Sequence, residues 1–320
     1  MSIPFDWERK RVLVTGAAGF VGRHLVRHLL ARGARVYAGT SPQDCAQPPR
    51  WEGQTHALAL TFDIRDAGAV HDAVEKARPD LVFHLAAVGV TDPGIDPMTA
   101  LTVNAGGAIN LLEALRGTAL ERMVMTGTCH EYGVSGGAEL DPFSAYSASK
   151  VAAWAFGRMY WRAHELPVVT VRPFQVYGPG QPAHALIPSA IGAALRGEDF
   201  PMTPGGQMRD FVFVDDLARG MMAAAETAVA EGQSLDLGTG TGVRVLEVVE
   251  HIWDLTRAPG EIRAGALRYR EASAMHLVAD ADQTAGMTGW RATTPLHEGL
   301  RVTVRALKLG SDYPYDDGII

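Results

Sequence analysis

The sequence predicts an α/β protein built on a doubly wound parallel sheet and completed by a smaller C-terminal lobe. Short apolar segments alternate with amphipathic ones through the first half of the chain, which is the pattern of βαβ units. A glycine-rich turn follows the first apolar segment. Beyond residue 172 the alternation loosens. We therefore expect residues 1–172 to form the sheet domain and residues 173–320 mainly the smaller lobe, with some later segments returning to the sheet.

The individual elements follow from local pattern. The expected strands are short apolar runs, and the expected helices have apolar residues three and four positions apart. The strands are 11–15, 35–38, 56–62, 81–85, 122–126 and 167–172. The helices are 21–31, 67–77, 98–116 and 146–164, with shorter ones at 186–196, 216–230 and 245–255.

Composition excludes several classes of function. The 320 residues are 47% hydrophobic and 20% charged, which is typical of a globular chain with a large core. A net charge of −7 offers no basic footprint for nucleic acid or an anionic membrane. There is no secretory-type N-terminus and no apolar run of membrane-spanning length, and two cysteines suit a reducing compartment. We expect a cytoplasmic protein without nucleic-acid or membrane partners.

The turn after the first strand has the pattern of a dinucleotide-binding loop. Gly16 permits a tight turn, Gly19 lets the backbone approach a pyrophosphate, and Gly22 allows the helix to pack on the strand. The first helical residues, Phe20 and Val21, present backbone N–H groups to the anion. Because this loop opens the first of several βαβ units, it predicts a site for NAD or NADP.

The end of the second strand bears on the choice between these cofactors. An acidic residue there usually binds the ribose 2′-OH of NAD. This chain has Thr40 at that position, and the nearest arginine is Arg50. A small hydroxyl without a repelling carboxylate favours NADP(H), with NAD(H) as the alternative.

Tyr146 and Lys150 lie one turn apart on one face of an expected helix. A phenol ionises at about pH 10, and a nearby ammonium group and nicotinamide ring would both favour the phenolate. Tyr146 could then exchange a proton with a hydroxyl while hydride moves at the same carbon. Tyr and Lys at this spacing also occur as exposed helical pairs, but behind a dinucleotide loop we favour catalysis.

Seven motifs along nearly the whole chain carry a family resemblance. They are TGAAGFVG (15–22), DIRD (63–66), HLAA (84–87), YSASK (146–150), RPFQVYGPGQ (172–181), RDFVFVDDLARG (209–220) and LVADADQTAGMTGW (277–290). In this order they resemble the extended short-chain dehydrogenase/reductase family. More narrowly, they resemble its branch of NAD(P)-dependent epimerases and dehydratases that act on nucleotide sugars. The resemblance implies a Rossmann domain followed by a substrate-binding lobe.

The resemblance also implies roles for individual residues. Asp63 and Ile64 would contact the adenine, and Asn104 would brace the active site. Further cofactor contacts are implied for Leu85, Ala86, Ala87, Asn104, Tyr146, Lys150 and Pro173.

Catalytic and substrate residues follow from the same resemblance. In the family motif that ends in Tyr-Gly, the catalytic Ser or Thr lies four residues before the Tyr, so Tyr132 points to Thr128. Thr128 would hydrogen-bond the reacting oxygen together with Tyr146. The positions at which relatives bind the sugar or the diphosphate hold Gln175, Arg209 and Arg270. A guanidinium group suits a diphosphate, although either arginine could instead form a surface ion pair.

The residues after Thr128 bear on the reaction type. Family dehydratases have Asp-Glu there, whereas this chain has Cys129 and His130, which disfavours dehydration. His130 could act as an acid or base, or simply line the sugar pocket. No other histidine has a ligand-like spacing to this pair, so no metal site is predicted. We assign no role to Glu131.

The expected activity is therefore oxidoreduction at C4 of a nucleotide sugar. The enzyme would either reduce a 4-keto-6-deoxyhexose or epimerise C4 through a transient ketone. One alternative is a 4,6-dehydratase or C3/C5 epimerase that uses His130. Another is a non-catalytic cofactor-binding regulator, which the intact Tyr146 and Lys150 disfavour. A homodimer is expected, formed by the helices after Met98 and after Tyr146.

Overall fold

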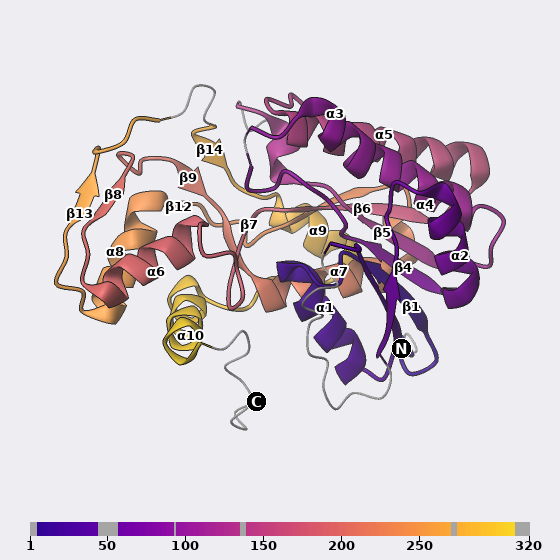
Figure 1. Cartoon of the computed structure of the whole chain (residues 1–320), viewed down its shortest axis with the longest axis horizontal. Helices are drawn as coiled ribbons and strands as arrows, with labels where there is room; N and C mark the ends of the chain where they lie inside the picture. The colour runs from indigo at the N-terminus through magenta and orange to yellow at the C-terminus, as the bar shows by residue number, and fades with distance from the viewer. Residues whose placement is uncertain (1–4, 44–56, 93, 135–138, 270–273, 311–320) are drawn as a thin grey trace.

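A seven-stranded parallel sheet forms the centre of the larger domain (Figure 1). The computed structural model describes residues 5–43, 57–92, 94–134, 139–269 and 274–310. The strand order is β3-β2-β1-β4-β5-β6-β11, with every neighbouring pair parallel. The bounds are β1 Arg11–Thr15, β2 Arg35–Thr40, β3 Ala57–Thr61, β4 Leu81–His84, β5 Arg122–Thr126, β6 Val168–Pro173 and β11 Ser234–Leu237. The predicted α/β fold class is confirmed.

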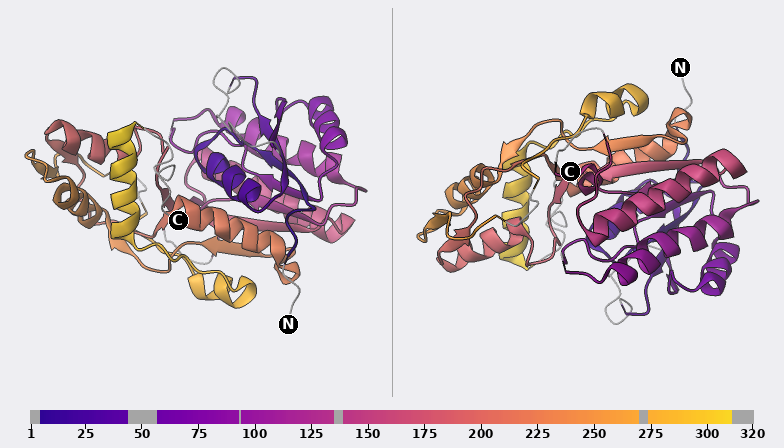
Figure 2. Two further views of the ribbon diagram at one scale, coloured as in Figure 1. Left: turned by 90° about the horizontal axis from the view of Figure 1, so that it is seen from below. Right: turned by 90° about the horizontal axis from the view of Figure 1, so that it is seen from above.

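Two helical layers cover the sheet, which makes it doubly wound (Figure 2). One layer contains α1 (Phe20–Ala31) and α7 (Val214–Glu226), and the other contains α2 (Ala67–Ala77), α4 (Gly107–Leu115) and α5 (Ala145–His164). Alternate residues of each strand face opposite layers. Val12 and Val14 pack with the first layer, whereas Leu13 packs with the second. In the inner strands β1, β4 and β5 both faces are buried, so these strands are almost continuously apolar between their end residues.

The chain crosses to the smaller lobe after β6 and later returns to the sheet. Strand β11 pairs with β6, with Ser234 opposite Thr170 and Leu237 opposite Pro173. On the other side of the sheet centre, the strand order reverses between β1 and β4. In open α/β sheets, ligands bind at the carboxyl ends of the strands at such a reversal.

The segment expected to be one helix over residues 98–116 is a composite. It consists of α3 (Pro97–Ala100), the π-helical segment η2 (Leu101–Gly106) and α4. The side chain of Asp96 caps its start by accepting a hydrogen bond from the backbone N–H of Thr99 at 2.8 Å. Isolated π-helical turns are frequent at functional sites.

The smaller lobe has its own apolar core. Helices α6 (Leu186–Arg196), α8 (Val245–Thr256) and α10 (Leu296–Leu309) surround a cluster that includes Tyr177 and Ile191. Its strands form three small sheets and are β7 Gln175–Tyr177, β8 Phe200–Met202, β9 Met208–Arg209, β10 Phe211–Phe213, β12 Val243–Arg244, β13 Ile262–Ala264 and β14 His276–Leu277. Helix α9 (Ala281–Thr288) packs beside β11. Within the described ranges, no helix combines the length and apolar character needed to cross a bilayer.

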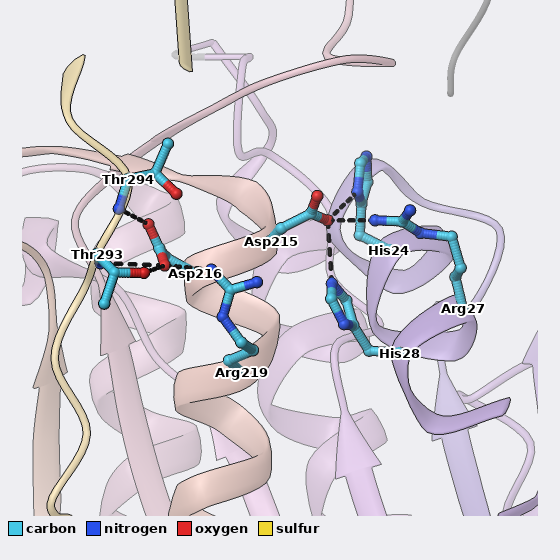
Figure 3. Close-up of polar contacts among 8 residues, drawn as sticks. All are labelled: His24, Arg27, His28, Asp215, Asp216, Arg219, Thr293 and Thr294. Carbon is cyan, nitrogen blue, oxygen red and sulfur yellow. Dashed lines mark hydrogen bonds and ion pairs between the residues drawn. The ribbon is translucent and has the colours of Figure 1, made fainter. Parts of the chain in front are cut away.

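Two adjacent carboxylates in the first turn of α7 tie distant elements together (Figure 3). Oδ1 of Asp215 lies 2.7 Å from Nδ1 of His24, 2.7 Å from Nη2 of Arg27 and 3.2 Å from Nε2 of His28, all on α1. Burial alone would raise the pKa of Asp215. The hydrogen bonds from both histidines and the charges of His24 and Arg27 outweigh burial, and they hold this pKa far below its usual range.

The second carboxylate, Asp216, anchors the segment that leads into α10. It is completely buried and accepts hydrogen bonds from the backbone N–H of Thr294 at 2.8 Å and the hydroxyl of Thr293 at 3.1 Å. It also forms an ion pair with Arg219 (Figure 3). Both acids therefore have structural partners at a helix start.

We expect Asp216→Asn to lower the free energy of unfolding by about 2–3 kcal/mol, because a buried charge-assisted hydrogen-bond cluster loses its charge. Urea unfolding measures this change. The matched control is Asp282→Asn, which breaks an exposed ion pair with Arg291 and should cost less than about 1 kcal/mol. Equal losses in the two variants would show that Asp216 is no anchor.

Candidate active site

The glycine loop between β1 and α1 makes a close approach to the end of β4. Gly16 has φ of +68°, and a Cβ there would lie 2.8 Å from the backbone nitrogen of Ala86. A Cβ on Gly22 would overlap the carbonyl oxygen of Gly16. Gly19 caps α1 without a side-chain hydrogen bond, and α1 then begins with Phe20. The N-terminal amides of a helix lack intrahelical partners, so this turn is built to receive an anion.

Three residues expected to contact the cofactor follow β4 and lie beside this loop: Leu85, Ala86 and Ala87. The backbone N–H groups of Leu85 and Ala86 donate to the carbonyl and hydroxyl oxygens of Thr15, both at 3.2 Å. The Thr15 hydroxyl also lies 2.8 Å from Nδ1 of the buried His84. Because Thr15 ends β1 and His84 ends β4, these bonds hold the two strand exits together. Ala87 is partly buried and continues the same segment.

The predicted adenine-side residues lie at the ends of β2 and β3. Thr40 is buried, and its hydroxyl donates to the carbonyl of Leu60 at 3.5 Å. Asp63 forms a bidentate ion pair with Arg65, whose hydrogen bonds to its side chain hold the pKa of Asp63 below its ordinary value. Ile64 is buried against Gly107. Arg50, considered for cofactor choice, lies outside the described residues.

An open groove of about 630 Å³ runs past this region. Its walls come from the Asp63 turn on one side and from the η2–α4 helical run on the other. The lining residues are Asp63, Arg65, Asp66, Thr102, Gly106 and Asn110. The groove is thus continuous with the predicted adenine side.

Asn104 braces the centre of the site from the π-helical segment. Its amide exchanges hydrogen bonds with the backbone of Val88, accepting at 2.8 Å and donating at 3.0 Å. Its amide nitrogen also donates to Oγ of Ser149 on α5 at 2.9 Å. Asn104 is completely buried. It therefore joins the segment after β4 to the helix that carries Tyr146.

Thr128, Tyr146 and Lys150 meet at the carboxyl end of β5. The Thr128 side chain lies close enough to the phenol of Tyr146 to act on its pKa. Nζ of Lys150 donates to the carbonyl of Thr126, the last residue of β5, at 2.7 Å. All three predicted catalytic side chains are buried. Side chains from a strand end and the following helix thus converge on one small polar centre.

Burial sets the proton affinities of this centre. It raises the pKa of Tyr146 above its ordinary value, against the opposing hydrogen bond from Thr128. It lowers the pKa of Lys150 to about 8, although the charge of Glu131 raises it. The sequence predicted that Lys150 would favour the phenolate. This role stays a prediction: burial has the largest effect on the pKa of Tyr146, and the Lys150 ammonium donates to the carbonyl of Thr126.

His130 and Cys129 differ sharply in their capacity for chemistry. Cys129 packs against Phe174 and Leu277, and burial raises the pKa of its thiol to about 12. His130 is half-buried beside the ring of Phe143, and burial together with the charge of Arg209 lowers its pKa. Burial thus favours the neutral form of His130 and disfavours the thiolate of Cys129. Among described residues, no cluster of three or more ligating side chains could hold a metal.

The residues expected to bind substrate lie at the start of the smaller lobe. Pro173 ends β6, and Gln175 begins β7, where its backbone N–H donates to the carbonyl of Asp210. Arg209 donates to the carbonyls of Met208 and Ala274 at 2.8 and 2.6 Å. Arg209 lies close enough to shift the pKa values of Cys129 and His130. Arg270 lies outside the described residues.

Sequence reasoning missed the buried partners of this centre. Glu131, to which no role was assigned, is completely buried and forms an ion pair with Arg172 at 2.7 Å. His84, a buried neutral histidine whose pKa burial and Lys150 lower to about 3, was also missed. One signal was available: an arginine inside the apolar strand Val168–Pro173 requires a buried partner.

With this geometry in view, comparison with known proteins identifies the class. The NAD dependent epimerase/dehydratase family matches residues 12–238. A UDP-glucose 4-epimerase of Mycolicibacterium smegmatis is 31% identical over 311 residues, which cover 92% of this chain and 97% of the relative. A probable dTDP-glucose 4,6-dehydratase of Sinorhizobium fredii is 32% identical over 327 residues, with coverage of 92% and 91%.

A solved structure extends the likeness to three dimensions. MoeE5 in complex with UDP-glucose and NAD has a TM-score of 0.80 at 31% identity, covering 93% of this chain and 99% of that one. The fold and site thus define an enzyme of the extended short-chain dehydrogenase/reductase type. Within that type, the chain belongs to the NAD dependent epimerase/dehydratase family.

We expect Gly16→Ala to weaken cofactor binding by about ten-fold or more, equivalent to roughly 1.4 kcal/mol, because the new Cβ would press on the Ala86 backbone. Fluorescence titration with NADH and NADPH measures the affinity. Gly117→Ala is the control, since Gly117 also has positive φ but nothing lies within 4 Å of its Cβ position. Normal affinity in Gly16→Ala would contradict the loop's role.

Proposed function

We propose that the enzyme oxidises and reduces C4 of a nucleotide-activated hexose. The observation that carries this proposal is the buried cluster of Thr128 and Tyr146, close enough for Thr128 to act on the pKa of Tyr146, with Lys150 one turn further along α5. This pair can hold one sugar oxygen and move its proton. The names of the relatives, a UDP-glucose 4-epimerase and a probable dTDP-glucose 4,6-dehydratase, support a nucleotide sugar as substrate.

The residues of the cofactor site fit a nicotinamide dinucleotide. Gly16 and Gly22 leave no room for side chains, and the backbone amides at the start of α1 suit a pyrophosphate. Asp63 and Ile64 would hold the adenine end, and Lys150 the nicotinamide ribose. When bound, the cofactor supplies the hydride acceptor and donor. Thr40 in place of an acid favours NADP(H), while the family's description favours NAD, so both need to be assayed.

The proton chemistry follows from the residues themselves. Tyr146 accepts the proton of the C4 hydroxyl when the sugar is oxidised and returns it when the ketone is reduced. Thr128 donates a hydrogen bond to the same oxygen and keeps it beside Tyr146. Lys150, with a pKa of about 8, is mostly protonated at neutral pH and supplies the positive charge that stabilises a developing phenolate.

The smaller lobe would bind the nucleotide diphosphate. A guanidinium group has five N–H donors in a planar fork, which suits phosphate oxygens. Arg209 lies at the lobe boundary and is oriented there by two backbone carbonyls. Gln175 begins the first strand of that lobe. We assign both to the substrate's diphosphate or sugar, together with Arg270 as the sequence predicts.

Epimerisation and ketoreduction at C4 differ in whether the cofactor is consumed. Both begin from the same Thr128–Tyr146–Lys150 centre. Elimination of water needs an additional acid and base next to Thr128, and the buried Cys129 cannot supply one. We therefore favour C4 epimerisation or ketoreduction over 4,6-dehydration.

A second candidate rests on His130. This side chain is neutral and half-buried directly after Cys129, so it could remove a proton from C3 or C5 of a 4-ketosugar. Such a step incorporates solvent deuterium at that carbon, whereas C4 chemistry alone does not. Running each turnover in D2O separates the two candidates.

We expect Tyr146→Phe to lower kcat by about 10²–10⁴-fold, because the proton shuttle is lost. The assay tests UDP-, GDP-, dTDP- and CDP-sugars with NAD(H) and NADP(H), following cofactor consumption and product stereochemistry. Tyr160→Phe is the matched control: Tyr160 is buried on the same helix and hydrogen-bonds Glu113, so its loss should leave kcat essentially unchanged. Full turnover by Tyr146→Phe would refute the mechanism.

We also propose that two copies pair through the helical face formed by α3, η2 and α5 (Figure 1). This face exposes large apolar side chains, which favours burial in a dimer. They are Met98 (61% exposed), Leu101 (43%), Phe156 (40%) and Met159 (40%).

We expect Phe156→Arg to convert a dimer into a monomer in sedimentation equilibrium, because a charge would enter the apolar contact. Leu307→Arg is the control, since Leu307 is equally exposed (41%) but lies on α10 of the smaller lobe. A wild type that sediments as a monomer would overturn the proposed dimer.

A further inference from the structure

A buried ion pair lies directly behind the catalytic centre. Glu131 is completely buried and Arg172 is 5% exposed. Nε of Arg172 lies 2.7 Å from Oε2 of Glu131. Glu131 belongs to the short 3-10 helix η3 (Cys129–Tyr132) that follows β5, whereas Arg172 belongs to β6. The pair therefore connects the turn after β5, which follows Thr128, with the end of β6, where the chain enters the smaller lobe.

The other carboxylate oxygen of Glu131 holds the backbone of Thr128. Oε1 accepts the Thr128 N–H at 2.9 Å, while the Thr128 hydroxyl oxygen accepts the N–H of His130 at 3.3 Å. This reciprocal capping box fixes the Thr128 side chain at the start of η3. The carboxylate also occupies the space beside Gly127, where a Cβ would collide with Oε1. Glu131 thus determines where the Thr128 hydroxyl stands.

Arg172 is itself fixed from two sides. Nη1 donates to the hydroxyl of Tyr132 at 3.3 Å, and that hydroxyl donates to Oδ1 of Asp236 on β11 at 2.6 Å. The guanidinium carbon also lies 5.1 Å from the ring centre of Tyr132 and 5.6 Å from that of Trp154. Cation–π contacts and charged hydrogen bonds together hold the guanidinium in one orientation. The Glu131–Arg172 ion pair is consequently held in place and can support the backbone of Thr128.

The charge of Glu131 acts on the catalytic side chains. It raises the pKa of Lys150 and that of Tyr146. From β4, the buried His84 faces Lys150, and from β6, Arg172 faces Glu131. The titratable and charged groups around the centre in the described part of the chain are His84, Cys129, His130, Glu131, Tyr132, Arg172, Arg209, Asp210 and Asp236.

We propose that Glu131, held by Arg172, is a positioning residue that orients Thr128 and sets the electrostatic environment of Lys150 for cofactor binding and catalysis. The part concerning catalysis rests on the function proposed above. The part concerning cofactor binding rests only on the cofactor site. Glu131 would touch neither substrate nor cofactor and would act through Thr128 and Lys150.

The test is the pH dependence of cofactor affinity in Glu131→Gln. Glutamine keeps an oxygen that can accept the Thr128 N–H and removes only the charge. Affinity for NADH or NADPH, whichever binds the wild type more tightly, should fall as pH rises through the pKa of Lys150. Without the carboxylate, we expect the midpoint of this fall to lie lower by roughly one pH unit. In turnover assays both limbs of the kcat–pH profile should also move to lower pH.

Loss of one buried charge leaves Arg172 unpaired and can prevent folding. Glu131→Gln combined with Arg172→Gln removes both charges and should also lower the midpoint, by less than the single variant, because loss of the Arg172 cation offsets part of the lost attraction. Glu231→Gln is the matched control. Glu231 also forms an ion pair with a buried arginine, Arg122, which begins β5 at the opposite end from Thr126. It should leave the midpoint unchanged.

An unchanged midpoint in the folded single or double variant would overturn the proposal, as would an equal shift in Glu231→Gln. The binding measurement needs no sugar substrate. A wild type that binds the cofactor but turns over no nucleotide sugar would contradict the proposed function, while the pH curve would still decide the role of Glu131.

Discussion

The hydrogen bond from Lys150 to the carbonyl of Thr126 is the contact on which the rest of the site depends. It fastens α5 to the carboxyl end of β5, and it satisfies an ammonium group that is almost completely buried. Because Tyr146 lies one helical turn before Lys150, the same contact brings its phenol beside Thr128, two residues past the strand. The packing of α5 against the end of β5 thus brings the three side chains Thr128, Tyr146 and Lys150 together.

Burial gives this centre its energetic character. An isolated charge in a protein interior is costly unless it is paired and hydrogen-bonded. Lys150 has a carbonyl acceptor and the nearby carboxylate of Glu131, and Glu131 in turn has Arg172. Burial lowers the pKa of Lys150 and the charge of Glu131 raises it, which leaves this pKa at about 8, near physiological pH. A group poised in this way responds to small electrostatic changes, which is characteristic of functional sites.

Much of the fold and the core of the site could be predicted from the sequence because both are locally encoded. The Gly16 loop, the apolar strands and the Tyr146–Lys150 spacing each depend on neighbours within a few positions. The buried partners could not be predicted in this way. Glu131 meets Arg172 across 41 positions, and His24 meets Asp215 across 191. Such pairs depend on strand order, which no local pattern specifies.

Burial also separated two residues that the sequence placed side by side. Cys129 turns into an apolar cluster with Phe174, whereas His130 stays half-exposed beside Phe143. Their order along the chain does not reveal which one faces the interior, because a short 3-10 turn follows the strand. The composite helix around Asn104 was missed for a similar reason, since its π-helical segment has the same apolar pattern as an ordinary helix.

The proposed function requires hydride to leave and return at C4 of a nucleotide sugar. The most direct measurement follows a deuterium label placed at C4 of a sugar that the enzyme turns over. We expect the label to be recovered at C4 of the epimerised sugar or in the reduced cofactor, with none released to water. A label that stays in place while solvent hydrogen enters at C3 or C5 would contradict it.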